Sequence, residues 1–201
     1  MNAAANPRSS RIERVTNETD ITVDLTIDGR GHGHVQTRIP FFDHMLNLFS
    51  RHSLVDLNVQ ADGDIDIDFH HTVEDTGIAL GQAFTRALGD KRGIRRYGHA
   101  YVPMDETLVR VVVDFSGRPY LAYETPAHLA PINGTFAFTL VEEFLRAFTN
   151  NAGINLHVAI LYGRDSHHMA EAIFKGLAKA VDAACQLDPR VEGVPSTKGT
   201  L

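Results

Sequence analysis

Two short segments of the chain contain the residue types that bind divalent metal ions. Residues 70–74 read His-His-Thr-Val-Glu, and residues 167–171 read His-His-Met-Ala-Glu. Both segments place two adjacent histidines ahead of a glutamate at the same spacing. Imidazole nitrogens and carboxylate oxygens suit Mn²⁺, Fe²⁺ or Zn²⁺, and the ligand types alone do not choose between these ions. The repeated pattern therefore predicts metal chemistry.

The spacing within each segment predicts how the ligands divide. Adjacent side chains on a helix point in different directions, so the two histidines of a pair do not readily bind one ion together. His71 and Glu74 are three residues apart and share a helical face, as do His168 and Glu171. One histidine and the glutamate of each pair are thus expected at one ion, with the other histidine at a second ion.

Each metal site needs a further ligand. In the first half of the chain the candidate is His44, with Asp43 as the acid that would orient its ring. The equivalent position in the second half is Glu143, and its carboxylate also suits a divalent ion. A purely structural metal site is the alternative to a catalytic one.

A second set of residues suits a phosphate group. Arginine presents a planar fork that matches phosphate oxygens, and lysine adds a positive charge. The members of this set are Arg95, Arg96, Arg118 and Lys198, the last of them in the Pro-Ser-Thr-Lys-Gly segment at 195–199 that also contains Ser196. Glu18 and Glu106 begin predicted strands at matched positions, where a carboxylate is either a general acid or base or a simple turn residue.

The elements that carry these residues also occur twice. Alternating apolar residues predict strands at 21–27 and 109–115, each ending at a glycine turn. Strands at 33–39 and 119–125 are expected to form hairpins with them. Further strands are expected at 54–60, 64–69 and 154–161. Helical periodicity predicts helices at 41–52, 71–89, 139–150 and 167–186.

These elements predict an α+β fold of two similar halves, each a mostly antiparallel sheet with two helices on one face. The expected segments are a disordered tail at 1–10, halves at 11–92 and 93–187, and a C-terminal arm or loop at 188–201. Helices on one face leave other faces without partners. The halves are therefore expected to pack on each other, and the molecule to oligomerise.

Composition restricts location and partners. The chain has 201 residues and a net charge of −6, which argues against nucleic acid as a partner. No apolar run approaches the roughly 20 residues that span a bilayer, and the N-terminus has no apolar signal core. Its single cysteine, Cys185, excludes an intramolecular disulfide and fits a reducing compartment. A cytoplasmic protein with no membrane partner is expected.

Taken together, these motifs resemble the imidazoleglycerol-phosphate dehydratase family of histidine biosynthesis. The likeness runs from Arg11 to the Pro-Ser-Thr-Lys-Gly segment at 195–199. Its most specific parts are 42–46, 70–75, 90–94 and 165–168 with Glu171.

This resemblance implies a metal-dependent dehydratase, a carbon-oxygen lyase, that converts D-erythro-imidazoleglycerol phosphate to imidazole acetol phosphate plus water. The substrate would react as an imidazolate bound to two metal ions. The resemblance also implies duplicated βαβ-type halves of the ribosomal-protein and GHMP-kinase-like group, and two Mn²⁺ per active site. The implied assembly is a homo-oligomeric shell of 24 subunits with active sites between subunits.

The resemblance assigns roles to matched positions. The implied metal ligands are His44, His70, His71, Glu74, Glu143, His167, His168 and Glu171. The implied substrate contacts are Glu18, His44, Arg51, His52, His70, His71, Arg96, Arg118, Ser196 and Lys198. The implied catalytic residues are Glu18, Glu74 and Glu171, with Glu18 moving protons at the side-chain carbons. Some members of the family have histidine in place of Glu143, so either Glu143 or water is the eighth ligand.

Two other functions would use the same residues. A binuclear metallohydrolase of phosphate esters would activate water with the same ions and release phosphate. A non-catalytic metal-binding or assembly protein would explain the histidines but would leave Glu18 and the cationic residues unused.

Overall fold

The computed structural model describes residues 7–126 and 129–201. These residues form two successive sets of four strands and two helices. The first set is β1 (Ser9–Val15), β2 (Thr19–Thr26), β3 (Gly33–Gln36), α1 (Pro40–Ser53), β4 (Asp56–Gly63) and α2 (His70–Leu88). The second set is β5 (Tyr97–Met104), β6 (Thr107–Asp114), β7 (Tyr120–Glu124), α3 (Thr139–Ala152), β8 (Asn155–Tyr162) and α4 (Ser166–Cys185).

Both halves have the same sheet topology, with strand orders β1-β2-β4-β3 and β5-β6-β8-β7. Two of the three strand pairs in each sheet are antiparallel, and the pairs β3–β4 and β7–β8 are parallel. A helix joins the strands of each parallel pair, which is the βαβ connection. The prediction of two βαβ-type α+β halves is confirmed.

The prediction that the strands at 33–39 and 119–125 form hairpins with the preceding strands is wrong. β2 pairs with β1 along one edge and with β4 along the other, so no edge of β2 is left for β3. β3 instead pairs with β4 across the α1 crossover. The same arrangement places β7 beside β8 in the second half.

The structure also contains two strands that were not predicted and lacks one that was. β1 and β5 were not expected, because both are edge strands with few buried side chains; in β1 only Ile12 is buried. β1 starts at Ser9, inside the tail predicted at 1–10, whose first six residues lie outside the described ranges. The strand expected at 64–69 is a turn, in which Ile67 is exposed and the aspartates bond to the start of α2.

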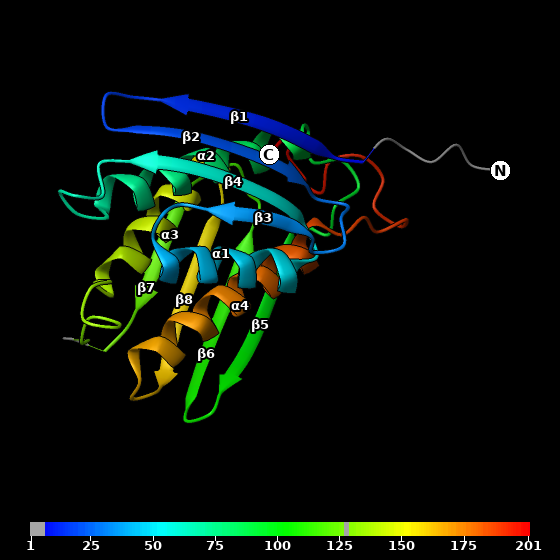
Figure 1. Ribbon diagram of the computed structural model, residues 1–201. Coiled ribbons are helices and arrows are strands. Elements are labelled where there is room, and N and C mark those ends of the chain that lie inside the picture. Colours follow the sequence, from blue (N-terminus) through cyan, green and yellow to red (C-terminus); the bar gives the residue numbers. More distant parts are fainter. Residues whose placement is uncertain (1–6, 127–128) are drawn as a thin grey trace.

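The four helices lie between the two sheets (Figure 1), where α2 packs on β1 and β2, and α4 packs on β5 and β6. Across the middle, α2 faces α3 and α1 faces α4. Buried side chains from both halves form one hydrophobic core, with Phe42, Phe84, Phe144 and Phe148 fully buried. The expectation that the halves pack on each other is confirmed. No helix of the described ranges is long and apolar enough to cross a membrane.

Close contact between α2 and α3 depends on Gly77 and Gly81. A Cβ at Gly77 would lie 2.8 Å from the carbonyl oxygen of Phe144, and one at Gly81 would lie 2.7 Å from that of Phe148. Gly77→Ala is therefore expected to lower the free energy of unfolding by about 1–3 kcal/mol, the usual cost of overpacking. Urea unfolding measures this change. Asn150→Ala, at an exposed position on α3, is the control and should change it by less than about 0.5 kcal/mol.

The histidine pairs occupy the first turns of α2 and α4. Asp165 fixes the start of α4, because its side chain accepts hydrogen bonds from the backbone N–H groups of His167 (2.7 Å) and His168 (3.2 Å). Asp68 accepts from the N–H of His70 (2.8 Å) at the start of α2. Both aspartates thus fix the helix start that carries the paired imidazoles.

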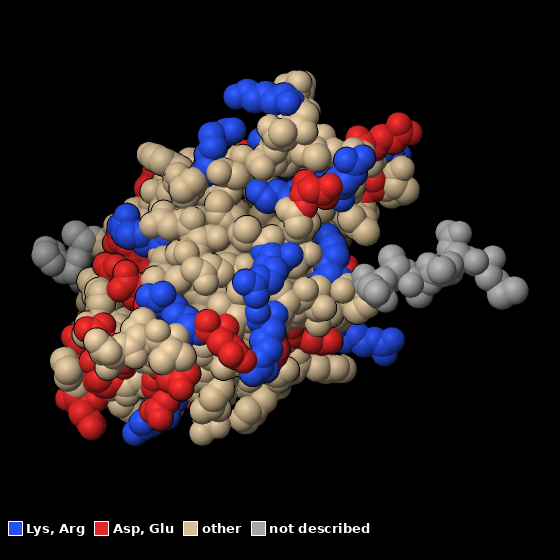
Figure 2. Space-filling model, turned by 90° about the horizontal axis from the view of Figure 1, so that it is seen from above, with Lys and Arg blue, Asp and Glu red and all other residues tan. Residues whose placement is uncertain are grey.

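Charged side chains of both signs are spread over the face in Figure 2. Acidic groups gather at its left-hand end, where Figure 1 places the β1–β2 turn and the β4–α2 loop. The end of β4 and that loop together contain four aspartates within residues 62–68. An acidic end suits a cation and repels a phosphate backbone.

Candidate active site

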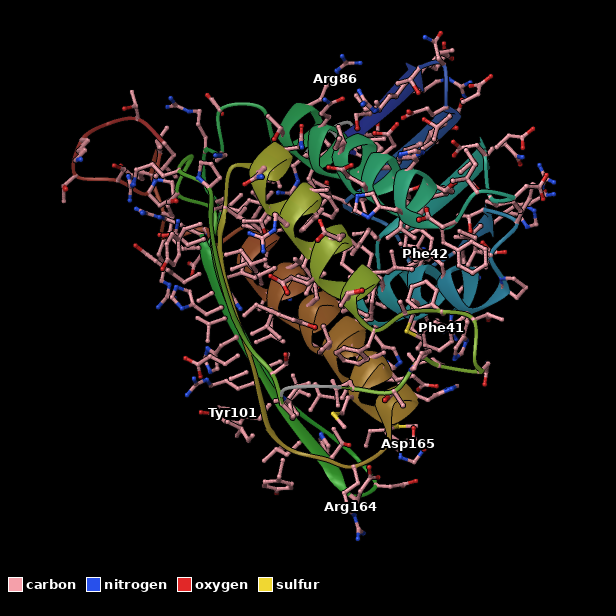
Figure 3. The ribbon with its side chains drawn as sticks, turned by 90° about the vertical axis from the view of Figure 1, so that its left-hand side faces the viewer. Phe41, Phe42, Arg86, Tyr101, Arg164 and Asp165 are labelled. Carbon is pink, nitrogen blue, oxygen red and sulfur yellow. The ribbon has the colours of Figure 1, made fainter. Side chains whose placement is uncertain are left out.

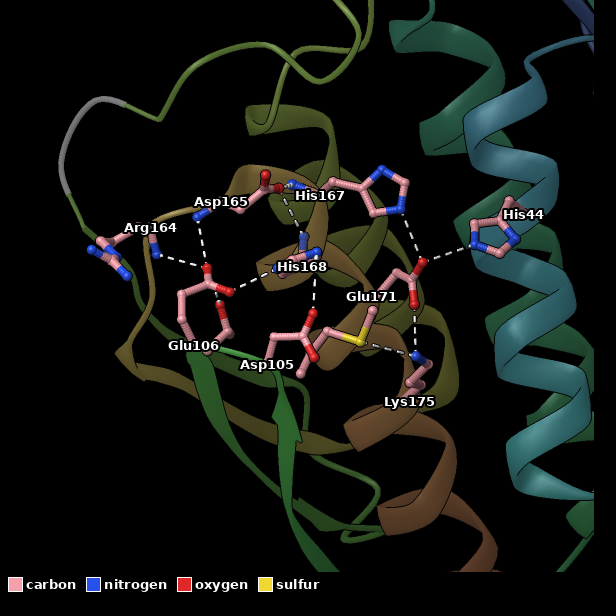
Figure 4. Close-up of polar contacts among 11 residues, drawn as sticks. His44, Asp105, Glu106, Arg164, Asp165, His167, His168, Glu171 and Lys175 are labelled. Carbon is pink, nitrogen blue, oxygen red and sulfur yellow. Dashed lines mark hydrogen bonds and ion pairs between the residues drawn. The ribbon is translucent and has the colours of Figure 1, made fainter.

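Three ligand-type side chains converge between α1 and α4. His44 Nε2 lies 3.0 Å from Glu171 Oε1, and His167 Nε2 lies 2.9 Å from the same oxygen (Figure 4). The ligand atoms of these three residues all lie within 4.8 Å of one another. No other group of three His, Cys, Asp or Glu side chains in the described ranges meets this spacing.

Glu171 is the central residue of this cluster. The residue is only 7% exposed, and its carboxylate also accepts a hydrogen bond from Lys175 Nζ at 2.6 Å. Burial alone would raise the pKa of Glu171, but the hydrogen bonds from Lys175, His44 and His167 outweigh burial and lower it to about 2. The carboxylate is therefore ionised at neutral pH, as a metal ligand must be.

The pairing within each helix differs from the expected spacing. Glu171 contacts His167, and Glu74 lies 3.7 Å from His70, so both contacts join residues four apart. The glutamates do not contact His168 and His71, three residues apart, and the predicted sharing of an ion with these histidines stays a prediction. Side chains four apart lie almost directly above one another on a helix, and the first histidine of each pair has that relation to the glutamate. The two histidines of each pair contact different carboxylates.

His71 and His168 face carboxylates outside their helices. His71 Nδ1 lies 3.0 Å from Asp64, and His168 Nδ1 lies 2.7 Å from Glu106. These hydrogen bonds raise the pKa of both imidazoles. A carboxylate on Nδ1 fixes the ring orientation and leaves Nε2 for another partner, which is the usual arrangement of a metal-binding histidine.

Glu18 and Glu106 occupy matched positions but have different surroundings. Glu106 accepts hydrogen bonds from His168 and from the backbone N–H groups of Arg164 and Asp165, which hold its pKa well below its usual range. The Glu18 side chain is 54% exposed, and its nearest charged partner is His71 Nδ1 at 3.7 Å. No hydrogen bond to the Glu18 carboxylate occurs within the described residues. The carboxylate of Glu18 is therefore open to solvent, whereas that of Glu106 is bound to His168.

Two acids that were predicted to take part in the metal site, one in each half, stand apart from the cluster. Asp43 does not orient His44; it accepts hydrogen bonds from the backbone and the hydroxyl of Thr37 and so secures the start of α1. Glu143 is half-buried on α3, and no hydrogen bond or ion pair to it occurs among the described residues. Glu143 thus matches His44 in chain position but not in contacts.

The predicted phosphate-binding residues gather at the C-terminal end of α4. The N–H of Arg96 donates to the carbonyl of Ala184, and its guanidinium binds Asp114 (2.7 Å) and the carbonyl of Pro195 (2.9 Å). This contact brings Ser196 and Lys198 to the same end. The turn that contains Arg118 packs against the last residue, because a Cβ at Gly117 would lie 2.5 Å from the carbonyl carbon of Leu201.

Arg51 and His52 lie in the last turn of α1, which faces α4. Burial lowers the pKa of His52, and the charges of Lys175 and Lys179 lower it further. A neutral His52 among these cations leaves a positive region beside the carboxylate of Glu171.

Comparison with known proteins shows the family. Residues 37–181 match the sequence model of imidazoleglycerol-phosphate dehydratase. The chain is 60% identical over 194 residues to the imidazoleglycerol-phosphate dehydratase of Geobacter metallireducens, an alignment that covers 96% of this chain and 99% of that protein. The chain belongs to the imidazoleglycerol-phosphate dehydratase family. The prediction of a dehydratase, a carbon-oxygen lyase of histidine biosynthesis, is confirmed.

Solved structures of the family support the fold. The chain is 38% identical to the imidazoleglycerol-phosphate dehydratase of Staphylococcus aureus, with a TM-score of 0.81 over 90% of this chain and 99% of that one. The enzyme from Pyrococcus furiosus, solved in complex with (S)-C348, is 35% identical, with a TM-score of 0.80 over 94% of this chain and 100% of that one.

Lys175, Asp64 and Asp165 were not among the predicted site residues of this family member. Lys175 follows Glu171 by four residues, so the helical spacing places it on the same face. Asp64 lies in an alternating Asp-Ile segment that resembled a strand, and Asp165 is the helix cap immediately before the histidine pair. Spacing in the sequence could have identified Lys175; only the fold identifies Asp64.

The donor set fits a divalent cation. His44, His167 and Glu171 offer two imidazole nitrogens and one buried carboxylate within bonding range of a shared ion, and no thiolate is present. Neutral imidazole with carboxylate suits Mn²⁺, Fe²⁺ or Zn²⁺. The carboxylates on His71 and His168 supply the outer support that such sites use.

Proposed function

We propose that this chain removes water from D-erythro-imidazoleglycerol phosphate to give imidazole acetol phosphate, with two Mn²⁺ ions in each active site. Family membership supports the reaction. The observation that carries the metal dependence is the convergence of His44, His167 and Glu171. In this proposal the first ion is held by that cluster, and the second by His70 and Glu74 with Glu143 or water. Nε2 of His71 and Nε2 of His168 complete the coordination of the two ions.

When bound, the two ions would polarise the imidazole ring of the substrate as Lewis acids and hold it in a fixed orientation. The chain's own residues prepare for this role. Asp64 and Glu106 orient the rings of His71 and His168, and Lys175 secures the carboxylate of Glu171. This outer support keeps the ligand atoms in place before substrate arrives.

Glu18 is proposed to move the proton. Elimination removes hydrogen from one carbon and hydroxide from its neighbour, and the enol that remains becomes the ketone by proton transfer. The hydrogen lies on a carbon without an adjacent carbonyl, so a carboxylate alone is too weak a base to remove it. Glu18 is exposed and lies beside His71, a position from which it reaches the reacting carbons of a ring held there.

The cationic residues are proposed to hold the phosphate. Arg96 is already fixed by Asp114, so its guanidinium needs little reordering when an anion binds. Arg118, Ser196 and Lys198 add charge and a hydroxyl donor from the neighbouring turn and arm. Anchoring the phosphate places the reacting carbons relative to Glu18.

The position of the phosphate residues supports a site shared between copies of the chain. Arg96 contacts the C-terminal end of α4, whereas His167 lies at its N-terminal end. α4 spans 20 residues, which is roughly 30 Å of helix. A substrate of one ring, three carbons and one phosphate is much shorter than this distance. We therefore propose that the phosphate residues of one subunit complete the metal cluster of another.

An apolar outer face supports the same assembly. The second sheet exposes large side chains on the side away from the helices, and Tyr101 projects from it in Figure 3. The exposed residues are Tyr97, Tyr101, Val112 and Tyr120. Surfaces of this kind are typical of subunit contacts. We propose a homo-oligomeric shell, of the 24 subunits that the family resemblance implies.

Mixing two inactive variants tests the shared site. His167→Ala breaks the metal cluster, and Lys198→Ala breaks the phosphate site. After dissociation and joint reassembly, about a quarter of the sites are expected to combine an intact cluster with an intact arm, because subunits mix at random in a symmetric assembly. Turnover should rise well above that of either variant alone. Continued inactivity, with mixed assemblies verified by mass, would place both sets of residues in one subunit's site.

The reaction itself is tested by an absorbance assay for the enolised product. Product should form with Mn²⁺, disappear after treatment with a chelator, and return when Mn²⁺ is restored. Chelation is also expected to loosen the assembly, measured by light scattering. Release of inorganic phosphate without the enol product would instead indicate a metallohydrolase, and full turnover in chelator would contradict metal dependence.

We also propose a cytoplasmic location without nucleic acid or membrane partners. The only cysteine of the sequence, Cys185, is buried and reduced. The net charge of −6 disfavours binding to phosphate backbones.

A further inference from the structure

We propose that Asp75 is a positioning residue for Glu18, acting through Thr19 and Arg14. Asp75 lies on α2, immediately after Glu74, and has no role in the site described above. This inference rests on the proposed role of Glu18 as the residue that moves the proton.

Asp75 joins α2 to both sides of the β1–β2 turn. The residue is 6% exposed. One oxygen accepts a hydrogen bond from Arg14 on β1 (2.8 Å), and the other accepts from the hydroxyl of Thr19 on β2 (2.5 Å). Glu18 lies between these two strands, directly before Thr19. The helix that carries His71 therefore also holds the turn that carries Glu18.

The backbone of this turn is fixed by further hydrogen bonds. The N–H groups of Glu18 (3.1 Å) and Thr19 (3.0 Å) both donate to the hydroxyl of Thr16. The carbonyl of Glu18 accepts from the N–H of Asp64 (3.1 Å). The backbone of Glu18 is thus held from two directions while its carboxylate stays free, which is the condition for a pre-positioned base.

The second half shows what happens without this aspartate. Thr107 matches Thr19 in position and burial, but its hydroxyl donates to Glu106 at 3.1 Å. Glu106 is also bound to His168 and two backbone N–H groups. The residue after Glu171, where Asp75 stands in the first half, is Ala172. With no carboxylate there, the threonine hydroxyl turns to the glutamate and helps to immobilise it.

In the first half, two aspartates bind the threonine hydroxyl and the imidazole ring whose counterparts in the second half bind Glu106. Asp75 takes the threonine hydroxyl, and Asp64 takes the imidazole of His71. The duplication therefore leaves one of its two matched glutamates bound and the other available. The ion pair of Asp75 with Arg14 is poorly suited to stability alone, since Arg14 Nε is buried without a hydrogen-bond partner among the described residues.

Substitutions at Thr19 test the inference without burying an unpaired charge. Thr19→Val keeps the shape of the side chain and removes the donor, whereas Thr19→Ser keeps the donor. In the fully assembled, Mn²⁺-loaded enzyme, Thr19→Val is expected to lower kcat by roughly 10- to 100-fold, the effect of a misplaced catalytic group, with KM and metal content nearly unchanged. Thr19→Ser should keep most of the turnover, and so should Thr22→Val, the control on the same strand.

Combination with Glu18→Gln separates positioning from general damage. If Thr19 and Asp75 act through Glu18, then Thr19→Val and Asp75→Asn should each cause no further loss in the Glu18→Gln background. The same fold-loss in both backgrounds, or equal loss for Thr19→Val and Thr19→Ser, would overturn the inference while leaving the role of Glu18 intact. Wild-type turnover of Glu18→Gln would refute the role of Glu18 itself. Because Asp75→Asn leaves Arg14 unpaired and is able to impair folding, Thr19→Val decides the outcome.

Discussion

Glu18→Gln is expected to lower kcat by roughly 10²- to 10⁴-fold, the usual contribution of a positioned acid or base. The amide has the shape of the carboxylate but accepts no proton. Glu18 takes no part in the metal cluster, and its carboxylate makes no hydrogen bond within the described residues, so the fold and the bound Mn²⁺ should be unaffected. Steady-state kinetics and metal content measured on the same assembled sample test both parts of this expectation.

Two matched variants sharpen the result for Glu18. Asp20→Asn removes an exposed negative charge from the same end of β2 and should leave kcat close to wild type. Glu106→Gln changes the matched glutamate of the second half and should act differently. It frees the ring of His168 and is expected to weaken Mn²⁺ binding by roughly 10- to 100-fold, as loss of an outer partner does. Near wild-type turnover of Glu18→Gln would remove Glu18 from the chemistry.

Glu171→Gln is expected to cost the enzyme one tightly bound metal ion per site and nearly all of its turnover. The carboxylate is buried and ionised, and it stands between His44 and His167. An amide offers a neutral oxygen, so the affinity for Mn²⁺ should fall by more than about 100-fold, beyond the effect of an outer partner. Calorimetric titration of the metal-free protein with Mn²⁺ measures the number of sites and their affinities.

The corresponding change on α3 tells the two sites apart. Glu143→Gln should leave the ion held with His44 in place and weaken only the other ion. Unchanged stoichiometry and affinity would mean that water, not Glu143, is the eighth ligand. Glu124→Gln, an exposed acid on β7, is the control and should leave both ions bound. Retention of both ions by Glu171→Gln would contradict the metal cluster.

The free and bound glutamates illustrate how a duplicated fold supports an asymmetric site. Glu18 and Glu106 occupy the same turn of the same topology, and a threonine follows each of them. Their surroundings differ because Asp64 and Asp75 have no counterparts around Glu106. The contacts of Asp64 with His71 and of Asp75 with Thr19 thus distinguish the available carboxylate of Glu18 from the bound carboxylate of Glu106.

Secondary structure with strong periodicity was predictable, and edge strands were not. The four helices and the central strands show regular apolar spacing because one side of each packs in the core. β1 and β5 bury little and so lack that pattern. The parallel pairing of β3 and β7 depends on which strand edge is left open, and this is decided by strands distant in the sequence.

The sequence by itself determined the ligand types, their duplication and the family, because residue identity and spacing within one helix are local properties. Only the tertiary structure decided which residues meet. Packing of α1 on α4 brings His44 to Glu171, and packing of α2 against the β1–β2 turn brings His71 beside Glu18. The same packing places the phosphate residues at the far end of α4 from the metal cluster. Contacts of this kind depend on how helices and sheets pack in three dimensions, and no local spacing encodes them.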